Sequence, residues 1–188
     1  RSICSAAPPF FQSRRDQRQV KTPLCNFCLR SGILCPKCQA KLDSGEITRT
    51  DLKIAQILLQ LEERFPSLQN VYFHKAVEAD GILALIVGQG DVPRLLSYGG
   101  KIIRELSQKT GKRIRILEHG VSDRKFLEDL FAPYPILTIN TIWLPDGTTE
   151  TRVILRKRGR NPPRLNIEAL KKIAKKLRGM TLRIEFSD

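Results

Sequence analysis

Four of the five cysteines in the chain lie in two closely spaced pairs. Cys25 and Cys28 form one C-x2-C pair, and Cys35 and Cys38 form a second pair after six intervening residues. Each tight turn brings two thiolates about 4 Å apart, so two such turns can surround one tetrahedral metal ion. We expect one zinc ion there; a single iron ion or disulfide bonds are the alternatives. Because protein fills all four ligand positions, the expected role of the metal is structural.

The positive charge of the chain is concentrated in three islands. The formal net charge is +14, and residues 1–49, 101–115 and 156–178 contribute +6, +5 and +9, respectively, with slightly acidic segments between them. Such clustering favours a nucleic-acid surface over an ordinary solvated surface, so RNA is the expected partner. No run of 18 apolar residues occurs, which predicts no membrane contact. Cysteines that serve as ligands imply a reducing compartment, so the expected location is cytoplasmic.

The N-terminal quarter of the chain divides into two expected segments. Residues 1–22 are rich in Pro, Gln, Ser and Arg, and we expect a basic flexible arm there. Its candidate phosphate contacts are Arg14, Arg15 and Arg18. Residues 23–47 hold the four cysteines and are too few to build a core without metal, so zinc would supply their folding energy.

From residue 48 onward, one order of elements occurs twice. The first copy has an apolar helical pattern over 48–65, strands at 71–78 and 82–88, a short helical piece, a helix at 101–110 and a strand at 112–117. The second copy has a helix at 122–131, strands at 136–144 and 148–156, a helix at 166–177 and a strand at 180–186. This recurrence predicts two α+β modules, 48–120 and 121–188. Phe126, Phe131 and Trp143 fall on expected core positions, and His74 and His119 on a strand and a turn.

The order α-β-β-α-α-β is that of the type II KH domain. The stretch from Gly90 to Asn140, with Phe131-Ala132-Pro133 at the linker, resembles the junction of paired KH domains in archaeal NusA-like proteins. The resemblance covers residues 48–188 and leaves the four-cysteine segment outside. It implies an α+β fold of two tandem type II KH-like modules after a small zinc-binding segment, the second module being degenerate. It also implies binding of single-stranded RNA in connection with transcription.

The resemblance places the RNA-clamping G-x-x-G loop of the first module at residues 97–100. The residues there are Ser97, Tyr98, Gly99 and Gly100, so the first glycine is replaced by serine. Two glycines still allow close approach of the backbone to phosphate at the start of a helix, with Lys101 and Arg104 nearby. Tyr98 is a candidate for stacking on a base. The alternative is a simple turn between two helices.

The second module has no glycine at the matching position. The aligned residues are Leu165, Asn166, Ile167 and Glu168. The preceding loop and the next helix instead supply candidate phosphate contacts: Arg156, Lys157, Arg158, Arg160, Arg164, Lys171, Lys172 and Lys175. This pattern predicts contact with the RNA backbone rather than with the bases.

The chain contains no convincing catalytic set, so we expect no enzyme and no small-molecule substrate. An RNA-processing enzyme is a third alternative, but the chain offers no catalytic residues to support it. Two other functions remain open. One is a NusA-like elongation or termination factor that contacts RNA and RNA polymerase. The other is a ribosomal protein or a factor bound to a ribosomal subunit, which would hold rRNA phosphates through the arm, the zinc segment and the modules.

Overall fold

The computed structural model describes residues 19–160 and 163–188. Two short helices, α1 (Asn26–Ser31) and α2 (Pro36–Asp43), form the four-cysteine segment, and α3 (Arg49–Glu62) follows. The first sheet consists of β1 (Phe73–Ala79), β2 (Ile82–Val87) and β3 (Arg113–Glu118), with α4 (Val92–Leu96) and α5 (Lys101–Thr110) between β2 and β3. The second sheet consists of β4 (Ile136–Trp143), β5 (Thr149–Arg156) and β6 (Leu182–Ser187). Helix α6 (Asp123–Phe131) precedes it, and α7 (Ile167–Arg178) lies between β5 and β6.

The two sheets have the same topology. In each of them the strand order follows the chain, the first two strands are antiparallel and the last two are parallel. Each hairpin has a register shift near the start of its first strand, between Phe73 and Lys75 and between Ile136 and Thr138. The α+β fold class is thereby confirmed, with two three-stranded sheets and a four-cysteine segment before them.

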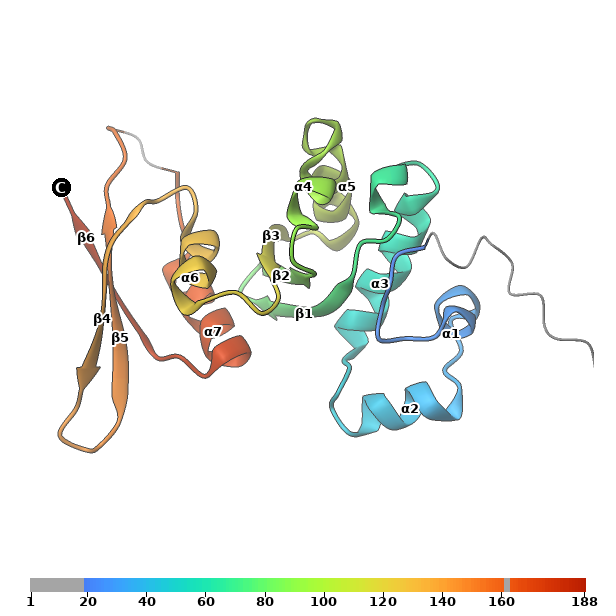
Figure 1. Cartoon of the computed structure of the whole chain (residues 1–188), viewed down its shortest axis with the longest axis horizontal. Coiled ribbons are helices and arrows are strands. Elements are labelled where there is room, and N and C mark those ends of the chain that lie inside the picture. Colours follow the sequence, from blue (N-terminus) through green and yellow to red (C-terminus); the bar gives the residue numbers. More distant parts are fainter. Residues whose placement is uncertain (1–18, 161–162) are drawn as a thin grey trace, which may run out of the picture.

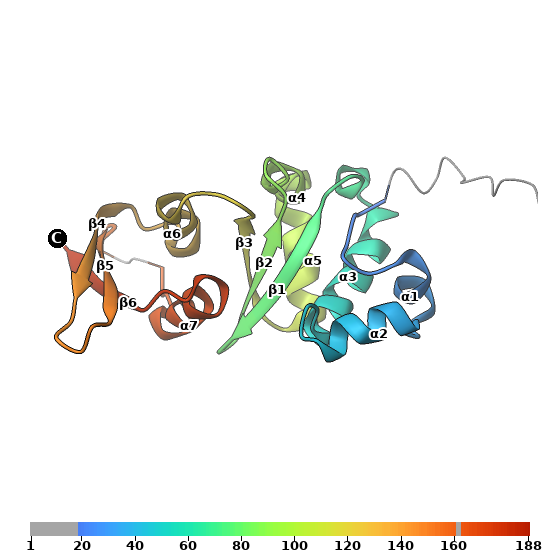
Figure 2. The ribbon, with the colours of Figure 1, turned by 60° about the horizontal axis from the view of Figure 1, so that its bottom comes forward.

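The elements form alternating layers of helices and sheets (Figures 1 and 2). One face of the first sheet packs on α3, α4 and α5 in a core that also includes side chains of the four-cysteine segment. The other face packs on α6 and α7, which in turn cover the inner face of the second sheet. Strand β2 is buried along its whole length because helices cover both of its faces. We call the part from α3 to β3 the first unit and the part from α6 to β6 the second unit. The two units pack against each other through α6 and α7.

Local sequence explains how α3 is fixed to the first sheet. Thr48 and Asp51 form a capping box at the start of α3, in which each side chain accepts a hydrogen bond from the backbone N–H of the other residue. The second carboxylate oxygen of Asp51 accepts a hydrogen bond from the buried backbone N–H of Ala76 at 2.6 Å. The same side chain therefore starts the helix and positions it against β1.

Among the described residues, the second unit has one α-helix fewer than the first. Helix α4 lies between β2 and α5, whereas residues 157–160 and 163–166, between β5 and α7, contain no helix. The sequence at this place has two consecutive prolines and several basic residues, and proline removes the N–H groups that a helix needs. The described part of the second unit therefore has the order α-β-β-α-β.

Two predictions about individual residues need correction, and two are confirmed. Phe126 and Phe131 are buried, as expected. Trp143 is wrong as a core residue, because 77% of it is exposed near the end of the β4–β5 hairpin. Residues 19–22, assigned to the flexible arm, also differ from expectation. Val20 is buried, and Lys21 pairs with the backbone of Val71 and Phe73 beside β1. No described helix combines the length and the apolar character that a membrane crossing requires.

Candidate metal centre and candidate RNA interface

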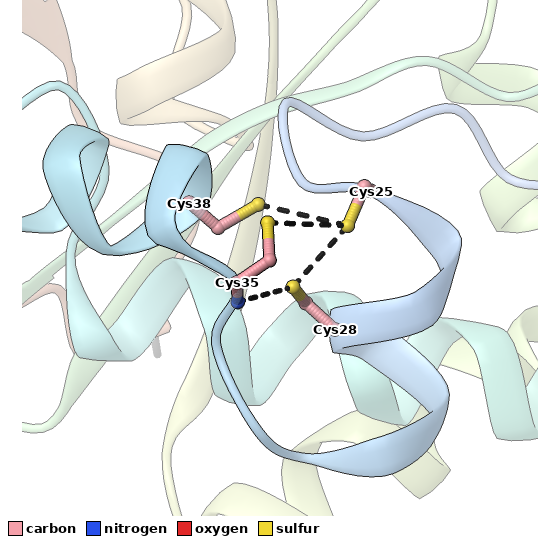
Figure 3. Close-up of side chains that lie close together, drawn as sticks. All are labelled: Cys25, Cys28, Cys35 and Cys38. Atoms are coloured by element: carbon pink, nitrogen blue, oxygen red, sulfur yellow. Dashed lines mark hydrogen bonds between the residues drawn. The ribbon is translucent and has the colours of Figure 1, made fainter.

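The four predicted cysteine ligands meet at one point (Figure 3). Their sulfur atoms all lie within 4.8 Å of one another. The Cys25 Sγ is 3.2 Å from that of Cys28, 3.9 Å from that of Cys35 and 3.8 Å from that of Cys38. Four thiolates around one zinc ion at about 2.3 Å would lie about 3.8 Å apart. The cluster therefore has the size of a four-sulfur metal site, and all four cysteines are unbridged.

Two matching knuckles place these sulfurs. Cys25 and Cys35 each immediately precede a helix, and Cys28 and Cys38 lie in the first turns of α1 and α2. The buried pair, Cys28 and Cys38, belongs to the same apolar core as α3. The backbone N–H of Cys35 also donates to the Cys28 Sγ at 3.1 Å, an arrangement that orients a sulfur ligand. The metal centre is therefore built on the first unit rather than attached to it by a free linker.

The thiol pKa values of Cys35 and Cys28 shift in opposite directions. A hydrogen bond from the Cys38 backbone is the main reason why the pKa of Cys35 is lowered to about 6. The Cys35 backbone likewise lowers the pKa of Cys28, but burial and the neighbouring sulfurs outweigh it and raise that pKa to about 12. Four thiolates at this separation would repel one another, and a bound divalent metal would offset that charge.

The turn between α4 and α5 has an unusual backbone. Tyr98, Gly99 and Gly100 have φ values of 57°, 65° and 77°, so three successive residues are left-handed. Glycine adopts this conformation freely, whereas a tyrosine there costs roughly 1–2 kcal/mol. Strain of this kind is retained where surrounding contacts impose it, and it is commonest at functional sites. Both glycines face open space, so a ligand can approach the backbone closely.

Contacts on both sides hold this turn in place. The Tyr98 ring packs on Phe65 with centroids 5.2 Å apart, while 47% of the tyrosine stays exposed. The Ser97 hydroxyl lies 2.8 Å from that of Ser67 and donates to the carbonyl of Arg94. Lys101 begins α5 and is exposed, and the Arg104 guanidinium donates to the Gly99 carbonyl at 3.0 Å. The structure thus brings together all six residues that the sequence assigned to this loop.

A shallow groove of about 260 Å³ lies between α4, α5, β3 and α6. Leu96, Ile103, Ile114 and Ile116 give it an apolar lining, and Leu96 is 53% exposed. Arg115 also lines it, and its guanidinium donates to the Ala132 carbonyl. Burial, and to a smaller extent the charge of Arg113, lower the pKa of Arg115. Sequence reasoning did not single out this groove, because its residues come from four separate elements.

The basic segment after β5 is exposed, but it is only partly free of contacts. Lys157 pairs with Asp188 at 2.5 Å, and Arg158 donates to the Pro133 carbonyl at 3.5 Å. Arg156, Arg160 and Arg164 are also exposed. At the matching turn, the Asn166 side chain accepts from the Ala169 N–H and starts α7, with no left-handed residue among positions 163–168. The backbone of this turn therefore differs from that of the turn before α5.

Some lysines of α7 contact the first unit, and others do not. Lys172 pairs with Asp80 of the first unit at 2.6 Å, and Lys176 donates to the Glu78 carbonyl at 3.0 Å. Lys171 pairs with Glu168 on its own helix. Lys175 is exposed, with no side-chain partner found in the described residues. Part of the predicted phosphate surface thus also joins the two units. Arg14, Arg15 and Arg18 lie outside the described residues.

One ring cluster was missed entirely. The rings of His74 and His119 stack 4.1 Å apart at an angle of 21°, and Tyr72 contacts His74 with centroids 4.2 Å apart. These residues come from β1 and from the turn after β3, and no local spacing signals their contact.

Comparison with known proteins identifies two curated relatives of part of the chain. The "Probable transcription termination protein NusA" of Methanocaldococcus jannaschii is 31% identical over 80 residues, which is 43% of this chain and 42% of that protein. The protein of the same name from Methanococcus vannielii is 23% identical over 77 residues, 41% of this chain and 43% of that protein. The chain thus spans about two fifths of the length of each. It shows weak homology to archaeal NusA-like proteins over that part.

Two further comparisons add no argument about function. No protein-family model matches the chain. The crystal structure of APE1850 aligns with 69% of this chain and 96% of its own, at 20% identity and a TM-score of 0.45, which is too low to support an inference.

Proposed function

We propose that this chain is a non-enzymatic RNA-binding protein of the transcription apparatus, similar in role to NusA. In this proposal, residues 48–120 and 121–188 are two type II KH-like domains, and the second is degenerate. Residues 23–47 form a zinc knuckle after a basic arm at 1–22. The protein would act in the cytoplasm on a nascent transcript and would contact RNA polymerase.

The observation that carries RNA binding is the left-handed turn at Tyr98-Gly99-Gly100. It exposes backbone at the start of α5, where the helix dipole favours an anion, and Lys101 and Arg104 are beside it. The groove behind it offers Leu96 and Ile114 as apolar surface for bases. A phosphate site next to an apolar groove is what a single strand with unstacked bases requires.

Zinc is the metal that we assign to the four cysteines. Sulfur ligands at tetrahedral spacing suit zinc, and a closed four-sulfur site leaves no position for substrate. The residues present therefore fit a structural ion. Its bond to Cys28 and Cys38 would fasten α1 and α2 to the core around α3.

The second unit would hold RNA by charge. Arg156, Lys157, Arg158, Arg160 and Arg164 form an exposed basic segment, and Lys175 lies on the following helix. Among residues 163–168, the turn before α7, no left-handed residue presents backbone. Contacts of this type go to phosphates, carry no sequence information and weaken steeply with salt.

The names of both relatives favour transcription over the ribosome. Neither is described as a ribosomal protein, so the ribosomal alternative gains no support from them. Purification of the tagged native protein at moderate salt separates the two. We expect RNA polymerase subunits to co-purify with it; sedimentation with ribosomal subunits in the absence of polymerase would contradict the transcription role.

RNA binding itself is tested by fluorescence anisotropy with a labelled single-stranded RNA 12-mer. We expect the unaltered protein to bind, and we expect binding to weaken by about tenfold or more when Gly99 and Gly100 are both replaced by Asp. Absence of binding by the unaltered protein would contradict the proposed function.

A further inference from the structure

A second pocket lies between the first sheet and the helices α6 and α7. It has a volume of about 650 Å³ and is open at one side. Its lining combines the β1 and β3 ends of the first sheet with the start of α6 and the end of α7. Ile86 and Leu117 give it an apolar floor, and Phe126 and Leu177 form its far wall. This volume is large enough for one nucleotide.

The two histidines form a ring platform at one wall of this pocket. They are the only histidines of the chain. The register shift between Phe73 and Lys75 turns His74 to the same face as Lys75, where it stacks on His119. His119 is exposed and Tyr72 is 39% exposed, so the stack of three rings ends in open surface on both sides. A flat, exposed ring of this kind suits stacking on another planar ring.

The pocket lining carries three charged residues, Lys75, Glu118 and Arg178. Arg178 is already committed, because it pairs with Asp123 at 2.6 Å and lies over the Phe126 ring. The Lys75 ammonium group has no hydrogen bond or ion pair among the described residues, so it is available for a phosphate. Glu118 is the acidic residue on the lining, and a carboxylate accepts a hydrogen bond from the amino group of a base.

Partial burial favours the neutral form of the His74 ring. Desolvation is the main reason why the pKa of His74 is lowered, the charge of His119 lowers it further, and Asp91 opposes them. A neutral His74 ring avoids repulsion within the stack of rings. Lys75 then remains the cation of the lining that is not paired with an acidic residue.

The pocket also adjoins the groove of the proposed RNA site. Glu118, at the end of β3, lines both of them. A strand that runs along the groove therefore needs only to pass the end of β3 to reach the histidines.

We infer that the pocket of His74, His119 and Lys75 binds one unpaired nucleotide of the RNA strand held by the adjacent groove. The base stacks on His119, its amino group faces Glu118, and a phosphate contacts Lys75. The inference rests on the proposed function for the source of the nucleotide. The same chemistry would also accept a free nucleotide, which the experiment below distinguishes.

Histidine NMR tests this site directly, since only two histidines contribute imidazole side-chain signals in the intact chain. We expect the single-stranded 12-mer (AC)6 to move the His119 signal upfield through the ring current of a stacked base, and AMP to do so only at much higher concentration. Equal saturation by AMP would also support the pocket, with a free nucleotide as its source. Binding of (AC)6 by anisotropy with both histidine signals unmoved would overturn the inference.

A matched set of variants gives a second readout. His119 is exposed, so H119A should leave the unfolding temperature unchanged, yet it should weaken (AC)6 binding by about fivefold or more, as loss of one stacked base does. H119F keeps a ring and should restore most of the affinity. Equal affinity of H119A and the unaltered protein would overturn the site.

The failures of the two proposals are distinguishable. If (AC)6 does not bind at all, the proposed function fails, and the AMP titration still decides the pocket. If (AC)6 binds and G99D/G100D abolishes it, but neither H119A nor the histidine signals respond, the pocket fails alone.

Discussion

The turns before α5 and α7 occupy the same place in two sheets of identical topology, yet they differ in almost every physical respect. The first turn has three left-handed residues, open space around two glycines and an apolar groove beside it. The second turn has a capping asparagine, no left-handed residue among positions 163–168 and a basic segment before it. In the proposed function, the first turn would offer RNA a positioned backbone, and the second would offer a set of charges.

The largest effect is expected from the candidate metal site of the four cysteines, which lies beside α3. Replacing both buried ligands, C28S/C38S, should abolish zinc binding and lower the unfolding temperature by about 10 °C or more, because these sulfurs lie in the core around α3. Metal analysis and thermal unfolding measure the two changes. Removal of zinc by a chelator should reproduce the loss in the unaltered protein. An unchanged unfolding temperature after complete zinc removal would contradict a structural ion.

The next largest effect should come from the basic segment of the second unit. Replacing Arg156, Lys157, Arg158 and Arg160 by Gln should weaken RNA binding at low salt and reduce the slope of log affinity against log salt by about 3. Anisotropy titrations at several salt concentrations measure it. An unchanged slope would show that phosphates do not contact this segment.

A smaller effect, but a more specific one, is expected at the first turn. G99D/G100D should weaken single-stranded RNA binding by about tenfold or more, because it adds negative charge and strained side chains where the backbone approaches phosphate. The matched control in the second unit is N166D, which keeps the α7 cap and adds one negative charge. If N166D and G99D/G100D weaken binding equally, the two turns do not differ as proposed.

The smallest effects are expected from replacing either of two lysines on α7, Lys172 and Lys175. Lys172 is paired with Asp80, whereas Lys175 is exposed with no partner found in the described residues. K175A should slightly weaken RNA binding and leave stability unchanged. K172A should lower the unfolding temperature by at most a few degrees, since exposed ion pairs contribute little. Thermal unfolding and anisotropy on both variants distinguish them, and the reverse pattern would contradict this division.

Periodicity and spacing were sufficient for the local features of this molecule. The helix over 123–131 and the hairpin of β1 and β2 follow from their apolar patterns, and the four cysteines meet as their spacing predicted. Such features are encoded within a few residues of one another, so they can be recognised without knowledge of the tertiary packing.

Features that depend on distant residues could not be read in the same way. Lys172 and Asp80 are 92 positions apart in the sequence, so a lysine that joins two units looks like any other on an exposed helix face. The contact of His74 with His119 depends on a register shift in β1. Trp143 alternates correctly for the inner face of β4, but the hairpin there extends past the helices that would cover it.

Ultraviolet crosslinking of a bound single-stranded RNA, followed by mass spectrometry of the crosslinked peptides, tests the central claim most directly. The account predicts crosslinks at residues 97–104, with Tyr98 as the main site because its ring is exposed beside the glycine turn. Saturated RNA binding with crosslinks confined to residues 156–178, and none at 97–104, would contradict it.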